Sequence, residues 1–453
     1  MNATLNNNTF TVAIVGAGPA GLFAARELAA SGVHVLIFNR DIKPGGLAEY
    51  GIYPDKLKMK EGLRHQFRQI LQNPNIKYFG NIQIGEGADI SLPELASTGV
   101  HAILIAVGAQ ATKWLGIPGE DLIGVYHAKD VVYHYNRLPP FSQNNIQIGK
   151  RVALIGVGNV MMDITHWLTH EKAVDDITVL ARRGPDETKF DLSQFEYVAS
   201  YLDLADLENE FVRVAPFMQR LGQDPEITKQ RLLSVLEKAE PRRTNAQLRL
   251  RFLKSPVKIL GNNLGRVNSL VLEENTLDLQ DSTVVSHGLG IFNSLDVDTI
   301  IFAIGDRVDR NIGLPVIANE FVKAPEPRFP VHDESYEIFD PQTGKIAENL
   351  FVAGWARKAS SGLVGLARRD GVNGAQTIGD YLKTRRSASP VSYEKLNTLL
   401  GTLNHPVVQK EDLLKLEEIE RLEAAALKLD DFKFNSNEEM LAVLGLFSEV
   451  KSY

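Results

Sequence analysis

The sequence predicts an α/β fold with two Rossmann-like dinucleotide-binding domains. Two strand–glycine turn–helix–strand units support this prediction, one in residues 10–39 and one in residues 151–181. The first unit places Gly16, Gly18 and Gly21 in G-x-G-x-x-G spacing directly after an apolar run. This is the position at which a strand passes into a helix in a dinucleotide-binding motif.

Composition sets the outer limits. The chain has 453 residues, which exceeds the size at which a single core keeps growing, so we expect more than one domain. It has no cysteine, which excludes disulfides, cysteine-ligated clusters and thiol nucleophiles. A net charge of −7 gives no general case for nucleic acid. We found no signal segment and no apolar run long enough for a membrane helix, so we expect a cytoplasmic protein without a membrane partner.

The glycines of the first unit have separate physical tasks. Gly16 permits the tight turn, Gly18 lets the backbone approach a pyrophosphate, and Gly21 lets helix and strand pack closely. A carboxylate that binds ribose is expected at the end of the second strand of such a unit. Asn39 stands there instead.

The chain then alternates between loops, helices and strands. Pro44, Gly45 and Gly46 indicate a loop, and an amphipathic helix is expected from Lys60 onwards. Short strands are expected at 77–81 and 102–107, and Gly108 follows the second of these.

The second unit begins with a strand at 151–155 and the turn Gly156-Val-Gly158, followed by a helix to about His170 and a strand at 177–181. Met161 occupies the place of the third small residue, so we expect either a wider helix–strand separation or a methionine packed between them. Arg182 and Arg183 end the strand. Arginine at this position accommodates a 2′-phosphate and favours NADP, although two solvated surface arginines are the simpler alternative.

Residues 211–258 are strongly basic, with eleven Lys or Arg against four Asp or Glu. A solvated face is one interpretation and an acidic protein partner is another, because concentrated charge speeds encounter. Nucleic acid is a weaker third, since no aromatic residues alternate with these charges.

A third strand, glycine turn and helix occurs at 350–383, without dinucleotide spacing. We expect Gly354 and Trp355 to cover a ring system bound by the first unit, or Trp355 to be a core residue. Residues 392–453 are expected to be mostly helical, and the apolar stripe in 410–429 is expected to pack on the main body or to bind a partner.

Taken together, several segments of this sequence resemble those of the adrenodoxin reductase-type ferredoxin–NADP reductases and, more distantly, those of the small subunit of glutamate synthase. The resemblance covers residues 11–383. It is carried by GAGPAGLFAA, PGGLAEYGIYPD, FGN, AVGAQ, IPGEDL, GVGNVMMD, ARRGP, RFLKSP and the GW…SGLVG segment.

The resemblance implies an NADP domain (113–324) inserted into an FAD domain (9–112 and 325–384), with a helical extension at 385–453. It implies FAD contacts from Gly16, Gly18, Pro19, Ala20, Gly21, Asn39, Arg40, Gly46, Leu47, Gly108, Gly354, Trp355, Gly362, Leu363 and Val364. It implies NADPH contacts from Gly156, Gly158, Asn159, Val160, Arg182, Arg183 and Gln194. Lys56, Asp163 and Trp355 are the candidate catalytic residues, and no metal site is implied. The family gathers cations for an acidic ferredoxin or flavodoxin where this chain has Arg242, Arg243 and Arg251.

Four residues depart from the family pattern. Asn39 replaces a glutamate that binds ribose, Lys56 a histidine beside the flavin, Gln194 a carboxylate of some members, and Met161 a small residue. Asp163 matches the family, with helix capping as the alternative role.

Three hypotheses follow. The first is a flavoprotein that takes hydride from NADPH and passes electrons singly to a ferredoxin or flavodoxin. The second is a flavoenzyme of the same fold that serves another acceptor or a partner subunit. The third is a flavin-binding sensor or interaction protein with little turnover.

Overall fold

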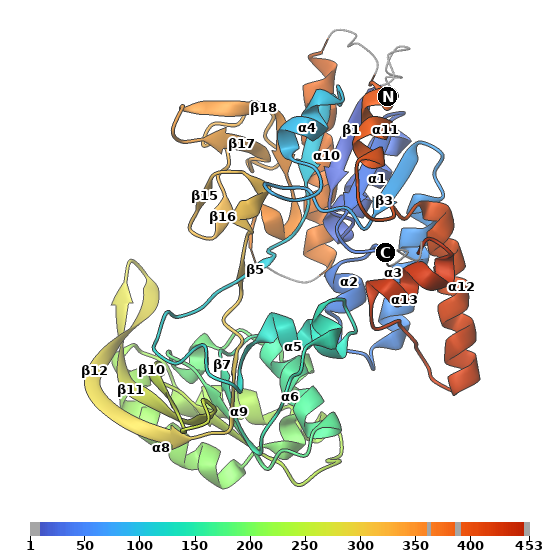
Figure 1. Ribbon diagram of the computed structural model, residues 1–453. Helices are drawn as coiled ribbons and strands as arrows, with labels where there is room; N and C mark the ends of the chain where they lie inside the picture. Colours follow the sequence, from blue (N-terminus) through green and yellow to red (C-terminus); the bar gives the residue numbers. More distant parts are fainter. Residues whose placement is uncertain (1–9, 360–363, 386–390, 448–453) are drawn as a thin grey trace. The chain divides into compact units, whose positions relative to one another are not determined.

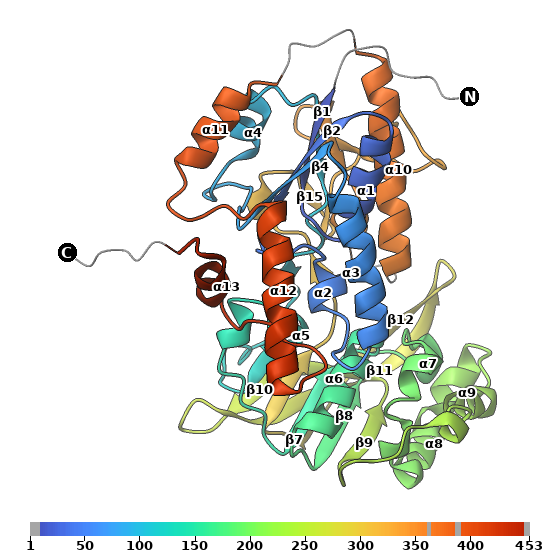
Figure 2. The same ribbon diagram turned by 90° about the vertical axis from the view of Figure 1, so that its right-hand side faces the viewer.

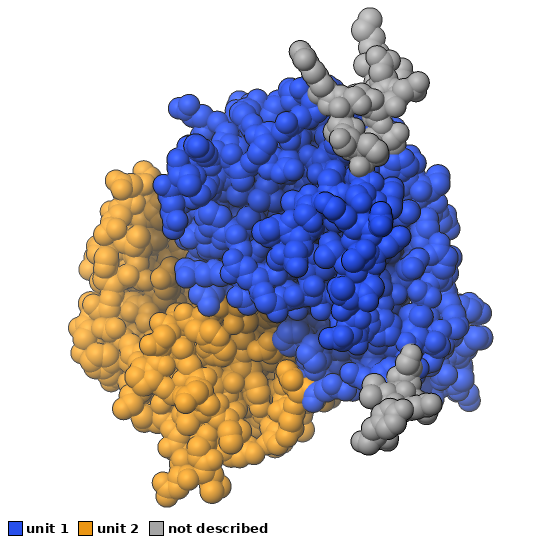
Figure 3. Space-filling view, turned by 45° about the horizontal axis from the view of Figure 1, so that its top comes forward, with its two compact units in different colours: residues 1–111, 133–143, 306–453 blue, residues 112–132, 144–305 orange. Residues whose placement is uncertain are grey.

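The computed structural model describes residues 10–359, 364–385 and 391–447, which form two compact units (Figure 3). Unit 1 comprises residues 1–111, 133–143 and 306–453, and unit 2 comprises residues 112–132 and 144–305. Unit 2 is therefore inserted into the sequence of unit 1. None of the helices in the described part of the chain combines the length and the hydropathy that a bilayer span requires.

Unit 1 is built on a six-stranded sheet with the order β17-β18-β4-β1-β2-β3 (Figure 1). Five strands are parallel and β17 is an antiparallel edge strand. The bounds are β1 Thr11–Val15, β2 His34–Asn39, β3 Ile76–Gly80, β4 Ala102–Ile105, β17 Glu337–Asp340 and β18 Lys345–Val352. Every residue of β1 is buried, as expected for a parallel strand covered on both faces.

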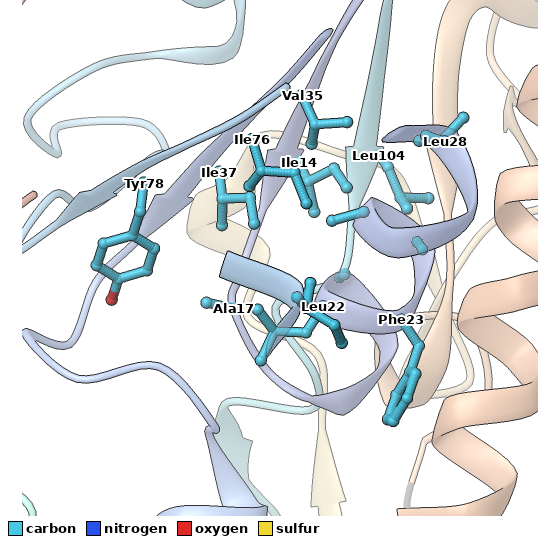
Figure 4. Close-up of a cluster of buried hydrophobic side chains, with 14 of the residues drawn as sticks. Ile14, Ala17, Leu22, Phe23, Leu28, Val35, Ile37, Ile76, Tyr78 and Leu104 are labelled. Carbon is cyan, nitrogen blue, oxygen red and sulfur yellow. The ribbon is translucent and has the colours of Figure 1, made fainter. Parts of the chain in front are cut away.

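One face of this sheet packs against α1 (Pro19–Ala30), α3 (Leu57–Leu71) and α10 (Val364–Lys383). Figure 4 shows strand residues such as Ile14 and Ile37 lying beside Leu22 and Phe23 of α1. The other face packs against α4 (Leu92–Ser97) and α11 (Tyr393–Gly401), which contribute Leu95 and Leu396. The predicted α/β layers are thus present in unit 1.

The C-terminal region completes the first of these faces. Helices α12 (Lys410–Leu427) and α13 (Asn437–Leu444) add apolar side chains to the cluster that contains α1 and α3. Figure 2 shows α12 beside α3. The prediction that the apolar stripe of the tail packs on the main body is confirmed.

Unit 2 contains a parallel sheet with the order β6-β13-β7-β8-β9 and an antiparallel sheet of β10, β11 and β12. The parallel strands are β6 Val125–His127, β7 Arg151–Ile155, β8 Asp176–Leu180, β9 Gln247–Arg251 and β13 Thr299–Phe302. The antiparallel strands are β10 Lys254–Gly261, β11 Val267–Gln280 and β12 Thr283–Asp296. The principal helices are α6 Asn159–Glu171, α8 Leu204–Arg220 and α9 Pro225–Leu233.

Shorter elements connect these parts. They are α2 Leu47–Tyr50, α5 Ala128–Tyr135, α7 Leu192–Phe195, β5 Ala111–Thr112, β14 Asp306–Arg307, β15 Val316–Ile317 and β16 Glu320–Phe321. Residues 133–143 and 306–324, which we expected in the second domain, lie in unit 1. Val308, Ile312 and Phe321 are buried there in the cluster that contains Ile338, which fixes the later segment to the first core.

Candidate functional site

The first glycine turn has the backbone that its spacing predicts. Gly16 lies in the left-handed region with φ of +105°, and a Cβ there would lie 2.6 Å from the carbonyl oxygen of Ala106. A Cβ on Gly21 would overlap the carbonyl oxygen of Gly16, so helix α1 packs directly on the turn. Among the described residues, no atom outside the immediate chain neighbours of Gly18 lies within 4 Å of a Cβ built there. A side chain would therefore meet close contacts at the first and third glycines but not at the second, where a phosphate approaches in such motifs.

Helix α1 presents its N-terminus at this turn. Gly18 is the N-cap, Pro19 begins the helix, no side chain caps it, and its first turn carries no acidic residue. Backbone N–H groups and the positive end of the helix dipole at such an end favour an anionic group.

Two other glycine segments meet the turn. A Cβ on Gly46 would lie 3.2 Å from Cα of Gly18, and a Cβ on Gly354 would lie 2.6 Å from Cβ of Ala20. The loops of residues 44–46 and 353–356 thus converge on the N-terminus of α1. The structure brings together the three segments that the resemblance assigned to FAD.

Asn39 is buried at the end of β2 and its carboxamide bonds entirely to this unit. Its Oδ1 accepts the N–H of Ala17 at 2.9 Å, inside the glycine turn. Its Nδ2 donates to the carbonyl oxygens of Asp41 and Lys43 at 2.8 and 3.1 Å. A carboxylate has no N–H to donate, so these two carbonyl partners give a physical reason for asparagine at this position.

The Gly354 turn is held by a partly buried ionic network. Asp370 of α10 accepts the backbone N–H of Gly354 at 2.5 Å and the hydroxyl of Tyr336 at 3.0 Å. The guanidinium of Arg357 joins Asp370 and Glu334. Burial raises the pKa of Tyr336 to about 12, so its hydroxyl stays a donor. Trp355 in this turn is half-buried.

The other predicted residues of unit 1 lie around these loops. Lys56 is half-buried just before α3, and its carbonyl oxygen accepts the N–H groups of Met59 and Lys60. Arg40 follows β2 and pairs with Asp41 at 2.9 Å. Leu47 begins α2, Gly108 follows β4 and Val364 begins α10. Gly362 and Leu363 lie outside the described residues.

A buried charge cluster joins the loop of residues 43–50 to the C-terminal tail. Glu49 accepts two hydrogen bonds from Arg64, at 2.6 and 2.7 Å, and lies 3.0 Å from Nζ of Lys433. Burial alone would raise the pKa of Glu49, but the charges of Lys433 and Lys43 and the bonds from Arg64 hold that pKa well below its usual value. Lys43 in turn bonds to Glu420 of α12 at 2.5 Å. Sequence reasoning missed this cluster, because its members are far apart in the chain.

The second glycine turn repeats the first in unit 2. A Cβ on Gly156 would overlap the carbonyl oxygen of Ala303. In the part of the chain that the structure describes, no atom beyond the neighbours of Gly158 lies within 4 Å of a Cβ on that residue. Gly158 is the N-cap of α6, without a capping side chain or an acidic residue in the first turn. Met161 is fully buried, so the alternative in which the methionine packs inside is the one observed.

The side chains beside this turn differ in their engagement. Asn159 bonds to the 191 loop, with Nδ2 donating to Oδ2 of Asp191 and Oδ1 accepting its N–H, both at 2.7 Å. Val160 is 43% exposed at the start of α6. Asp163 in the first part of α6 and Gln194 in α7 are half-buried.

Arg182 and Arg183 directly follow β8, and Arg182 is exposed. Among the described residues, neither guanidinium has an ion pair or a hydrogen bond, whereas most arginines nearby are paired. Two unpaired guanidinium groups at this place match the pattern that accommodates a 2′-phosphate.

The basic stretch is mostly neutralised within unit 2. Arg251 forms a bidentate pair with Asp206, and Arg249 pairs with Asp176. Arg242 and Arg243 are exposed, and the guanidinium of Arg242 lies 5.3 Å from the ring centre of Tyr201. Of the three arginines predicted to dock a partner, Arg242 and Arg243 thus carry charge at the surface.

Comparisons with known proteins agree with this geometry. Residues 10–193 match the pyridine nucleotide-disulphide oxidoreductase family. The NADPH-ferredoxin reductase FprA of Mycobacterium leprae is 29% identical over 410 residues, covering 82% of this chain and 84% of that protein. The chain is thus similar to NADPH-ferredoxin reductases over most of its length. A mitochondrial NADPH:adrenodoxin oxidoreductase of Arabidopsis thaliana is 27% identical over 387 residues, covering 78% of each chain.

A solved structure supports the same relationship at the level of fold. FprA of Mycobacterium tuberculosis superposes with a TM-score of 0.76 and 24% identity, covering 97% of this chain and 99% of that one. The predicted fold class, with two dinucleotide-binding domains and a helical C-terminal region, is confirmed.

Proposed function

We propose that this chain is an FAD-dependent reductase that takes hydride from NADPH and passes electrons singly to a ferredoxin or flavodoxin. The observation that carries the proposal is a pair of glycine turns at helix N-termini without a capping side chain. The second turn is followed by two arginines whose guanidinium groups have no ion pair or hydrogen bond among the described residues. The names of the relatives, NADPH-ferredoxin reductase and NADPH:adrenodoxin oxidoreductase, support it.

The convergence of three glycine segments on α1 supports FAD in unit 1. We propose that the phosphates lie at the backbone of Gly18 and the start of α1, with Gly46 and Gly354 close enough to enclose them. The remaining contacts are proposed for Gly16, Pro19, Ala20, Gly21, Asn39, Arg40, Leu47, Gly108, Trp355, Gly362, Leu363 and Val364. In this assignment Asn39 acts through the glycine turn that it holds.

NADPH is proposed for unit 2. Its phosphates would approach Gly156, Gly158 and the start of α6, and Arg182 and Arg183 would hold the 2′-phosphate. Asn159, Val160 and Gln194 complete the proposed contacts. When bound, FAD would supply the chemistry that divides one two-electron hydride transfer into two one-electron transfers. Lys56, Asp163 and Trp355 stay our candidates for the reacting region.

We place the docking surface for the electron carrier at Arg242 and Arg243, because both are exposed. Arg251 belongs to the same stretch but is committed to Asp206. An acidic ferredoxin or flavodoxin would bind against these two exposed positive charges. The rate at which it is reduced would then fall as the salt concentration rises.

Anaerobic reduction of the flavin tests the proposal. NADPH should bleach it far better than NADH, and the reduced protein should then reduce a ferredoxin or flavodoxin from a panel of carriers. Normal turnover with artificial dyes but none with any carrier would indicate another acceptor. Failure of NADPH to bleach the flavin would contradict the enzymatic proposal.

Arg182→Ala tests the 2′-phosphate assignment. Loss of one charge-assisted contact, worth about 1.5–3 kcal/mol, should raise KM for NADPH by about tenfold or more and leave KM for NADH nearly unchanged. Lys238→Ala, at an exposed cation of the same unit, should change neither value. Equal effects of Arg182→Ala on both nucleotides would contradict the assignment.

A further inference from the structure

The C-terminal part of α6 carries His166 and His170, four residues apart and therefore on one face of the helix. Their rings meet edge to face with centroids 4.1 Å apart. Glu240 approaches them from the segment that follows residues 236–238. One ring nitrogen of each histidine and one carboxylate oxygen of Glu240 all lie within 4.8 Å of one another. Within the described ranges, no other three side chains of the metal-binding types come this close.

The environment of His170 indicates which of its ring nitrogens has a lone pair available for a ligand. Its Nδ1 lies 3.0 Å from the carbonyl oxygen of His166 and 3.0 Å from Oγ1 of Thr169. A carbonyl can only accept, and the Thr169 hydroxyl already donates to backbone carbonyl oxygens, so we assign the proton to Nδ1. Nε2 is left with its lone pair. Nε2 is buried, and it has no hydrogen-bond partner among the described residues. A histidine whose other nitrogen donates to a backbone carbonyl is the arrangement that metal ligands adopt.

Glu240 supplies the negative charge. Its backbone N–H donates to Glu196 at 3.1 Å, which fixes the segment, while its carboxylate has neither an ion pair nor a hydrogen bond within the described part of the chain. Glu171 and Arg243 also act on His170, with opposite charges. A buried lone pair and an unpaired carboxylate side by side are explained if a cation is their common partner.

We propose that His166, His170 and Glu240 form a binding site for a divalent transition-metal ion of the zinc class. Two imidazole nitrogens and one carboxylate oxygen form a borderline ligand set that suits Zn²⁺, with water as the fourth ligand. The three ligand atoms, which lie within 4.8 Å of one another, would have to move closer to bind one ion. The ion would fasten the end of α6 to residues 240–244, where Thr244 already donates to the carbonyl oxygen of Thr169 at 3.0 Å.

The test uses the full chain with its bound cofactor, stripped of metal by a chelator. Zn²⁺ is added in competition with a chromophoric chelator, and binding of one ion per chain is expected. His170→Gln and Glu240→Gln should each weaken this binding by more than about tenfold. His65→Gln, at an exposed helical histidine of unit 1, should leave it unchanged.

Trypsin provides a second readout. Zn²⁺ should slow cleavage after Arg242 and Arg243 in the unaltered chain and in His65→Gln, but not in Glu240→Gln. Far-UV circular dichroism of the metal-free variants shows that each has folded. Absence of a one-to-one zinc complex would overturn the proposal. So would an affinity for Zn²⁺ in His170→Gln and Glu240→Gln equal to that of the unaltered chain, and the cluster would then be a hydrogen-bonded core without metal.

Discussion

Lys60 offers the sharpest test of the electrostatics of unit 1. Its side chain is 1% exposed, and Nζ donates to Oδ1 of Asn136 at 2.9 Å. Burial, with the nearby charge of Lys433, lowers the pKa of Lys60 from 10.5 to about 7. Between these values the unfolded chain binds a proton that the folded chain does not bind. The free energy of unfolding therefore increases as the pH rises through this window, and the increase is absent below about pH 7.

The size of the effect follows from the two pKa values. One pKa unit corresponds to about 1.4 kcal/mol, so integration from pH 7 to pH 9 gives a gain of about 2 kcal/mol from Lys60 alone. Lys60→Met removes this contribution. The difference in unfolding free energy, wild type minus Lys60→Met, should rise by about 2 kcal/mol over that interval in urea titrations followed by circular dichroism.

A matched control separates this effect from other titrations. Lys58→Met, at an exposed neighbour on α3, should give the same difference from wild type at both pH values. A constant offset for Lys60→Met, from the lost bond to Asn136, is compatible with the reasoning. A difference that does not change between pH 7 and pH 9 would refute it.

Three further substitutions test the hydrogen bonds of the first glycine turn, the packing of α10 on α1 and the buried charge cluster around Glu49. Asn39→Asp removes the donors to two backbone carbonyls and should lower the free energy of unfolding by about 1–3 kcal/mol. It should also speed the loss of FAD, measured by dialysis and absorbance. Full retention of both FAD and stability would contradict the positioning role of Asn39. Gly371→Ala places a methyl group against the backbone of α1 and should cost about 1–3 kcal/mol in urea unfolding, whereas Gly379→Ala in the same helix meets no atom within 4 Å and should stabilise by up to about 1 kcal/mol. Glu49→Gln breaks a buried charge cluster and should cost about 3–5 kcal/mol, whereas Glu61→Gln, which removes an exposed partner of the same arginine, should cost under about 1 kcal/mol; similar losses in both would contradict the role of burial.

Much of the fold was predictable because its signals are local. Glycine spacing after an apolar run located both turns, and the observed β1, β7 and β8 lie within one residue of the expected strands. The approach of Gly46 and Gly354 to the first turn followed from family resemblance, since no local pattern relates residues so distant in sequence.

Other features depend on pairings that single-sequence patterns do not encode. The long β11–β12 hairpin was not expected, because β12 is largely exposed and its residues do not alternate cleanly between polar and apolar. The neutralisation of Arg251 required Asp206, which lies in a different element. The resemblance places Asn39 where the family has a glutamate that binds ribose, but it does not reveal the three backbone hydrogen bonds by which Asn39 holds the turn.

The position of β18 in the sheet of unit 1 has a consequence for biosynthesis. It pairs with β4, yet β4 ends at Ile105 and β18 begins at Lys345, so roughly 240 residues separate the two partners. At about 5–20 residues per second, a ribosome takes some tens of seconds to deliver the second strand after the first. Throughout that interval the edge of β4 lacks its native partner while the strands and helices of unit 2 emerge. An unpaired strand edge can pair with another chain, so we expect this interval to favour aggregation at β4.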